Sequence, residues 1–316
     1  MIQPILTSLF ASDLGSGAAY SGFYGTSPGT SLPFPLSVRT IMPIAGTFFN
    51  LHTQLEIVPS VTDPTRSRTI TLFVNGSPTA LENSIFGAER TAINKRDHVE
   101  VSVNDLVEYR YTTSNSPQAS AVFNSVLFSS SSMFLVSSNL KLGNNSIWLP
   151  FFGNNVTTFS NTSSSSSYIN VPINGTLRNM FVITNSQGNS VSGDMKLTVF
   201  KNGLVTGLST LILGTDTSGN SGAVEVSLNS GDYISLFAEH TSGGYQYSCG
   251  IEFVPNDSNK SFSGSRFIGA ADQTANLHYK VVFGEGIKTQ QNTLLNTPYT
   301  ISPCNMTIRD MYVDSI

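Results

Sequence analysis

The chain has 316 residues, a formal net charge of −4 and a sequence pI near 5.5, and charged residues make up only 11% of it, less than half of the roughly 25% usual for a soluble domain. The acidic balance and the lack of clustered Lys and Arg exclude a typical nucleic-acid-binding protein, and there is no apolar run of the roughly 18 residues that a membrane span needs. A polar but uncharged surface is expected where subunits pack closely, because each buried charge costs desolvation energy.

Short sequence patterns recur along the chain at a spacing of one whole domain. Three segments return in this way, at offsets of 127, 125 and 131 residues: 72–76 at 199–203, 99–104 at 224–229, and 173–182 at 304–313. A solenoid unit would have a period of about 20–50 residues, so this period indicates domains. We therefore expect one domain over 1–130, a second copy over 131–258, and the opening strands of a third copy over 259–316.

Strand patterns dominate the chain, as short apolar or alternating runs between Gly, Asn, Pro and Ser. In the first copy they fall near 36–42, 46–57, 68–74, 97–103, 106–112 and 119–128. In the second copy they fall near 146–152, 168–172, 176–184, 195–201, 208–213, 222–228, 232–239 and 246–253. The nearest approach to a helical period, over 81–95, is short and polar. These patterns predict an all-β protein of tandem antiparallel β-sandwich domains with a jelly-roll-like topology.

Serine-rich and glycine-rich segments punctuate these strands. Ser129–Ser132 is a linker between the first two copies, and its shortness predicts a fixed, closely packed pair. Gly15–Gly22 and Gly284–Thr289 are interpreted as turns rather than nucleotide-binding loops. The third copy is incomplete at Ile316, so we expect the polypeptide to continue; the alternative is that its strands complete a neighbouring subunit.

Residues that could carry out chemistry are scattered. The four histidines are His52, His98, His240 and His278. None of them has a Cys, Asp, Glu or second His at metal-ligand spacing, and the sequence contains no nucleophile or zinc motif. Cys249 and Cys304 occupy non-equivalent places in different copies, so we expect free, core-like cysteines. The sequence predicts no catalytic, cofactor-binding or metal site and no enzymatic activity.

Repeated carboxylates have a structural explanation. Glu100 and Glu225 recur between the copies, as do Asp105 and Asp232, approximately. Paired carboxylates can cleave glycosidic bonds, but repetition at equivalent places in two domains favours a shared structural role. The loop 216–222 has alternating oxygen ligands, yet a plain hairpin loop is a better interpretation than a Ca²⁺ site.

Exposed aromatic residues would indicate a sugar-binding face. The candidates are Tyr20, Phe23, Tyr24, Tyr245 and Tyr247. Tyrosine at strand positions is also ordinary sheet packing. The sequence leaves both interpretations open.

The order of motifs in the second copy resembles a known fold family. The second copy contains, in order, a strand, Asn202-Gly203, a second strand, and Ser230-Gly231-Asp232 before a third strand. This order is similar to that of the tandem C1q/TNF-like jelly-roll domains of large DNA viruses, phages and spore coats. The resemblance covers the second copy well, the first moderately, and the third only at its start. In the first copy Asn104-Asp105 replaces the Gly-Asp turn.

The resemblance implies a structural role on a virion surface or outside the cell. Such domains often form trimers, so the expected partners are further copies of the chain, other structural subunits, and a host glycan or receptor. The expected function is that of a fibre, spike or minor capsid protein. A carbohydrate- or receptor-binding module and a cell-surface or spore-coat protein are the alternatives, and a glycan-cleaving enzyme is a remote third.

Overall fold

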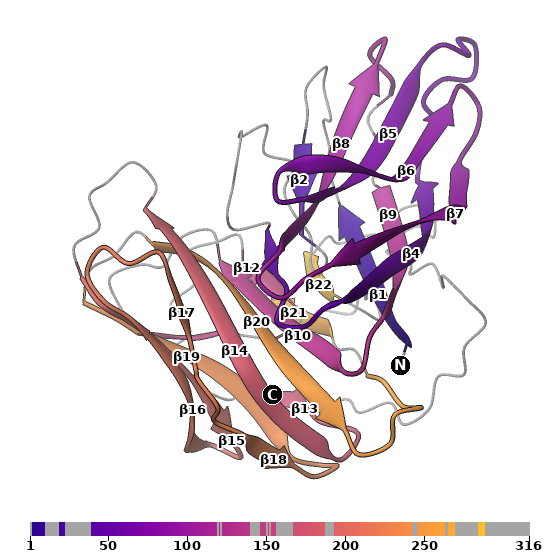
Figure 1. Cartoon of the computed structure of the whole chain (residues 1–316). Coiled ribbons are helices and arrows are strands. Elements are labelled where there is room, and N and C mark those ends of the chain that lie inside the picture. The colour runs from indigo at the N-terminus through magenta and orange to yellow at the C-terminus, as the bar shows by residue number, and fades with distance from the viewer. Residues whose placement is uncertain are drawn as a thin grey trace, which may run out of the picture.

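The computed structural model is built from β-strands. It describes residues 2–9, 19–22, 39–118, 120, 122–139, 146–149, 151, 153–155, 167–186, 193–241, 245–262, 265–268 and 284–287. The regular elements of this part are all strands, which confirms the all-β sandwich prediction, and it contains no apolar helix that could cross a membrane. Figure 1 shows two β-sandwich units in contact along one face.

The described part of the first unit has nine strands, which form two facing sheets. They are β1 (Ile2–Leu9), β2 (Ala19–Ser21), β3 (Thr40–Ile41), β4 (Gly46–Leu55), β5 (Ser67–Val74), β6 (Ser77–Phe86), β7 (Thr91–Val101), β8 (Leu106–Ser114) and β9 (Val122–Ser129). One sheet has the order β1-β9-β4-β7, and the other has the order β2-β8-β5-β6, with β3 also paired to β8. All pairs are antiparallel, and this order of strands is that of a jelly roll.

The second unit repeats this topology. Its strands are β10 (Met133–Asn139), β11 (Ile147–Leu149), β12 (Gly153–Asn155), β13 (Ile169–Asn170), β14 (Gly175–Ser186), β15 (Met195–Lys201), β16 (Leu204–Ile212), β17 (Ser218–Asn220), β18 (Val226–Leu228), β19 (Tyr233–His240) and β20 (Tyr245–Pro255). The sheet β10-β20-β14 matches β1-β9-β4, and β11-β19-β15-β16 matches β2-β8-β5-β6. The long strand β7 is replaced by two short strands, β17 and β18, which pair with opposite halves of β14.

The same turn chemistry builds both units. The Asn-Gly pairs at 75–76 and 202–203 have positive φ at both residues, as a two-residue hairpin requires. In each unit the turn Asn binds an Asp carboxylate, at 2.8 Å in the first unit and 2.7 Å in the second. That carboxylate belongs to Asp105 or Asp232, so this repeated pair has a structural role. Asn104, with φ 73°, takes the left-handed place of Gly231.

A repeated glycine and a repeated bulge set the course of β4 and β14. Asn50 and Asn179 have φ of 58° and 50°, and each lies where the pairing register shifts. Gly46 and Gly175 begin these strands beneath the aromatic rings of Phe128 and Phe253, and a Cβ on either glycine would collide with its ring. These positions therefore require glycine because of a close approach between strands.

Some strand predictions were wrong. The polar segment 77–95 forms β6 and the beginning of β7, because both strands lie at sheet edges where polar side chains are tolerated. Val103 lies in a turn and is exposed rather than in the core. Gly284–Ile287 forms a strand rather than the expected turn.

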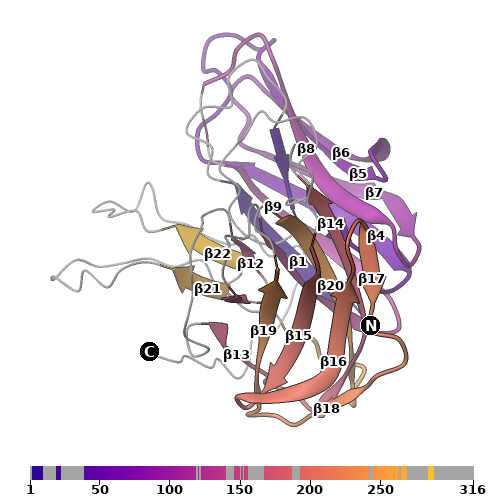
Figure 2. The same ribbon diagram turned by 90° about the vertical axis from the view of Figure 1, so that its left-hand side faces the viewer.

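Two further strands follow the second unit. β21 (Ser265–Ile268) and β22 (Gly284–Ile287) pair in parallel, with Ser265 opposite Gly284. Near the start of the second unit β10 and β12 also pair in parallel, with Ser137 opposite Gly153. Figure 2 shows β21 and β22 side by side. The predicted domain boundaries and the third copy stay predictions.

Replacing Gly175 with alanine should destabilise the protein. A Cβ there would collide with the ring of Phe253 and lie 2.6 Å from the Val254 carbonyl oxygen, and that backbone is fixed in the sheet. We expect Gly175→Ala to lower the free energy of unfolding by about 1–3 kcal/mol, as overpacking does. Gly207→Ala is the control, since its Cβ would make only an ordinary 3.4 Å contact. Urea denaturation measures both; equal stabilities would contradict the close approach.

Candidate functional site

The second unit buries the outer face of one sheet against the first unit. Alternate side chains of β10 and β20 point away from the second unit's own core, and in a free sandwich they would meet solvent. Instead Phe134 is 0% exposed and Glu252 3% exposed. Figure 1 shows the sheet that contains β14, β20 and β10 turned toward the first unit. We call this contact the junction.

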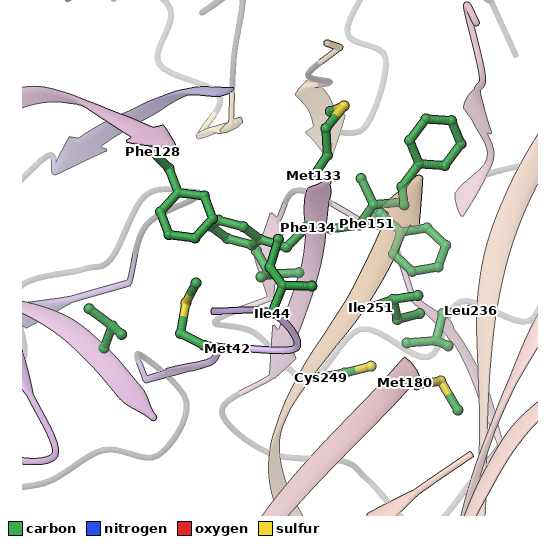
Figure 3. Close-up of a cluster of buried hydrophobic side chains, with 14 of the residues drawn as sticks. Met42, Ile44, Phe128, Met133, Phe134, Phe151, Met180, Leu236, Cys249 and Ile251 are labelled. Carbon is green, nitrogen blue, oxygen red and sulfur yellow. The ribbon is translucent and has the colours of Figure 1, made fainter. Parts of the chain in front are cut away.

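Backbone and side chains of the first unit meet this face closely. A Cβ on Gly250 would collide with the carbonyl oxygen of Ile41, so β20 lets the first unit's chain approach at a glycine. In Figure 3, Met42 and Ile44 lie beside Phe128 and Phe134, while Ile251 and Leu236 lie on the other side of the sheet, in the second unit's core. The sheet therefore separates two apolar layers.

A glutamine of the first strand satisfies the edge of β10. The Gln3 amide donates to the Phe134 carbonyl at 2.9 Å, and the Phe134 N–H donates to the Gln3 side-chain oxygen at 3.0 Å. Both groups are buried, so this pair satisfies backbone atoms of β10 that none of the described strands reaches. The contact fixes β1 relative to β10.

An aromatic pair marks the end of each unit. The rings of Phe128 and Phe134 lie 5.1 Å apart, edge to face at 88°. The rings of Phe253 and Phe262 lie 5.1 Å apart at 86°. Phe262 follows Phe134 by 128 residues and is 8% exposed. The contact that joins the first unit to the second is thus repeated where the second unit ends.

A buried carboxylate organises the linker. Glu252 accepts hydrogen bonds from Ser132 at 2.6 Å, from Arg178 at 2.9 and 3.1 Å, and from Asn179. Burial alone would raise the pKa of Glu252, but the hydrogen bonds from Arg178, Ser132 and Asn179 and the charge of Arg178 outweigh it, so the pKa is lowered. The carboxylate remains ionised and joins the linker to β14 and β20.

The opposite face of the second unit has a cluster of aromatic side chains. Trp148, the only tryptophan, lies 4.7 Å from Phe200 and 4.6 Å from Phe237, measured between ring centroids. The rings of Tyr168 and Tyr233 lie 4.3 Å apart beside the same sheet, tilted by 41°. All five are partly exposed. We call this set the outer aromatic face.

The first unit has charged groups at the equivalent place. Arg110 lies 5.9 Å from the ring of Tyr20 and 5.5 Å from the ring of Phe73, which are cation–π distances. Beside it, Arg39 pairs with the buried Glu108 at 2.7 Å. Burial raises the pKa of Glu108, and the hydrogen bond and charge of Arg39 oppose that rise only in part. The two units thus share a fold but present different chemistry.

The residues singled out for reactivity do not come together. In the described chain no three His, Cys, Asp or Glu side chains are placed to hold a metal ion. Burial, together with Lys95, lowers the pKa of His52, whose ring contacts Asn50 at 3.1 Å. Cys249 is fully buried, which raises the pKa of its thiol. His278 and Cys304 lie outside the described residues.

The aromatic candidates and the loop candidate have mixed outcomes. Tyr247 is buried and hydrogen-bonded to Ser137 at 3.0 Å, so it is a core residue rather than a sugar-binding one. Tyr20 is partly exposed beneath Arg110; the side chains of Phe23, Tyr24 and Tyr245 lie outside the described residues. The segment 216–222 contains β17, which pairs with β14. Sequence reasoning missed the outer aromatic face, for which the single tryptophan was the available signal.

Comparisons with known proteins assign no family. No family model and no curated protein matches the chain. A structure titled as PNGF-II in the C2 space group is 8% identical and aligns over 71% of this chain and 59% of that one, with a TM-score of 0.25. A structure of infectious bursal disease virus Gx strain is 13% identical over 82% of this chain and 73% of that one, also with a TM-score of 0.25. Likenesses at this level assign neither a family nor an activity.

Glu252 should make the protein sensitive to acid. Its pKa in the folded state is lowered, so the stability that it contributes is present above its unfolded pKa near 4.5 and is lost as the pH falls through the folded value. We expect Glu252→Gln to lower the free energy of unfolding at pH 7 by about 1.5–3 kcal/mol, as loss of a charged hydrogen-bond partner does, and to flatten its pH dependence below about pH 5.

The matched control is Glu100→Gln, at an exposed carboxylate of β7. Urea denaturation across this pH range separates the two variants. If the Glu252 and Glu100 variants lose acid sensitivity to the same small extent, the proposed role of the Glu252 cluster is wrong.

Proposed function

We propose that this chain is a non-enzymatic structural protein whose jelly-roll units are held in one fixed relative orientation. The specific role that we propose is a virion surface component: a fibre, spike or minor capsid protein, in contact with further copies, as a trimer or larger assembly, and with other structural subunits. The single observation that carries this proposal is the aromatic pair that ends each unit, Phe128 with Phe134 and Phe253 with Phe262.

The buried contacts of the junction make the connection between the two units rigid. β9 ends at Ser129 and β10 begins at Met133, so only three residues connect the units. The linker is tied down on both sides, since Ser132 donates to Glu252 and Gln3 binds Phe134. A short linker with a buried, hydrogen-bonded interface leaves no room for a hinge, in contrast with the flexible contacts common between domains.

The contact between the first and second units recurs at the end of the second unit. Phe262 packs on Phe253 as Phe134 packs on Phe128, and β21 pairs with β22 in the parallel manner of β10 and β12. A third unit that begins at Phe262 would therefore lie on the second as the second lies on the first. Units related by one repeated step form a rod, which is the shape of a fibre or spike.

The state of the native protein tests this proposal. We expect antibodies against the chain to label the surface of purified particles by electron microscopy, and the protein to sediment with those particles. Native protein found only as a free monomer, unattached to any particle or surface, would contradict the structural role.

A specific observation favours glycan or receptor binding as a second function. Trp148, Phe200 and Phe237 form a partly exposed aromatic cluster, and flat apolar rings of this kind can stack on the apolar face of a sugar. The equivalent surface of the first unit has Arg110 between Tyr20 and Phe73. The second unit is therefore the one to examine for binding.

Trp148→Ala should abolish any glycan binding that a glycan array detects for the intact chain, because the variant removes the largest ring of the cluster. Tyr20→Ala, at the equivalent place in the first unit, is the control and should bind as the wild type does. Glycan binding that survives Trp148→Ala would place the binding site elsewhere.

A further inference from the structure

The second unit has an unpaired strand edge. Among the strands that the structure describes, β16 is the last of its sheet and pairs only with β15. The backbone N–H and C=O groups on its other side are available to another strand. Edge strands of this kind are the usual place where a second chain adds to a sheet.

The edge is also apolar. Four of the nine large hydrophobic residues exposed in the described chain lie on or directly after β16: Leu204 at 73%, Val205 at 67%, Leu211 at 53% and Leu213 at 51%. No charged residue and no proline occurs from Leu204 to Leu213. Natural proteins normally protect an exposed edge with charge, proline or a cover.

The equivalent edge of the first unit is protected. Thr79 on β6 and Thr206 on β16 make the same bond, to the carbonyls of Leu72 and Val199, which establishes that the two strands correspond. The Asn94 side chain covers β6 by donating to the carbonyls of Ala80 and Glu82, at 3.3 and 3.0 Å.

β16 has no such cover. Gly207 and Ser209 correspond to Ala80 and Glu82 at an offset of 127 residues, so their carbonyls point outward from the sheet. Within the described second unit, no side chain donates to either carbonyl. β6 also carries Pro78 and the charged Glu82 where β16 has Val205 and Ser209.

The sequence of β16 is complementary to itself. We propose that β16 pairs antiparallel with β16 of a second copy of this chain, about a two-fold axis at Leu208. That register sets Leu204 against Ile212, Val205 against Leu211, Thr206 against Thr210, and Gly207 against Ser209, each on the opposite copy. Apolar residues then oppose apolar ones and threonine opposes threonine, as cross-strand pairing favours.

The backbone supports the same register. The outward carbonyls of Gly207 and Ser209 are placed opposite each other twice by the two-fold axis, so hydrogen bonds between the two copies would form on both sides of Leu208. Gly219 of β17 lies near the carbonyl of Leu211 at one end of β16, and the Val224 side chain lies near Gly207 at its centre, so the second copy has to meet the edge beside these two residues. The register shift between β15 and β16 next to Gly207 also occurs between β5 and β6. This bulge is therefore not a difference between the edge at β16 and the edge at β6.

The partner that this edge fits is a second copy, since self-complementary pairing produces a closed two-fold interface. The paired sheets would form one continuous sheet across two chains, and Val205, opposite Phe200 on β15, would extend the outer aromatic face toward the axis. This inference rests on the proposed structural function and names one of its contacts.

Sedimentation of the intact chain tests the pairing. Val205→Lys with Leu211→Lys places four like charges in the proposed interface, and we expect the dissociation constant of the dimer to rise at least about tenfold. The matched control is Phe86→Lys with Ile93→Lys, at exposed apolar residues of β6 and β7, which should leave association unchanged. Both pairs of sites are exposed, so neither variant should unfold.

Cross-linking fixes the register. In a Cys304→Ser background, Ser209→Cys should form covalent dimers with a short bis-maleimide, because the two copies of residue 209 lie near the axis. Glu82→Cys, on the covered edge, should not. Assemblies that form normally in the lysine variant, without cross-linking at 209, would overturn the pairing and leave the structural function standing. A chain that never associates would count against both.

Discussion

The structure depends on the burial of a second face of the sheet that contains β10, β20 and β14. A jelly-roll sheet normally has one face in the core and one in water. Here β10 is buried from Met133 to Val136, and in the first unit β9 is likewise buried from Val122 to Phe128. Strands buried on both faces lose their alternation, which explains the continuous apolar runs on either side of the serine linker. Loss of the first unit would expose Phe134 and leave the ionised Glu252 at a bare surface.

The junction also explains why certain residues recur. Gly46 and Gly175 lie beneath the rings of Phe128 and Phe253, and these rings in turn meet Phe134 and Phe262 edge to face. A glycine, the terminal phenylalanine of one unit and the first phenylalanine of the next thus form one repeated contact. On their outer surfaces the units have diverged. The first presents Arg110 between two rings, whereas the second presents an aromatic cluster and an open edge.

Local signals in the sequence predicted the features that local physics determines. The Asn-Gly pairs predict hairpin turns, and Asn202 and Gly203 both have the positive φ that such a turn requires. The edge strand β6 was missed because its polar residues, Pro78 and Glu82 among them, do not alternate with apolar ones. The Glu252–Arg178 pair and the Trp148–Phe237 contact join residues 74 and 89 positions apart, so no periodicity reveals them.

The distance between the two units tests the account most directly. Spin labels at Ala88→Cys and Ala223→Cys, both at exposed sites, report that distance by double electron–electron resonance in a Cys304→Ser background, where Cys249 is buried and unreactive. We expect one narrow distance distribution, because the junction holds the units in a single orientation. A broad or multimodal distribution would contradict a fixed junction, and with it the rigid rod that the proposed function requires.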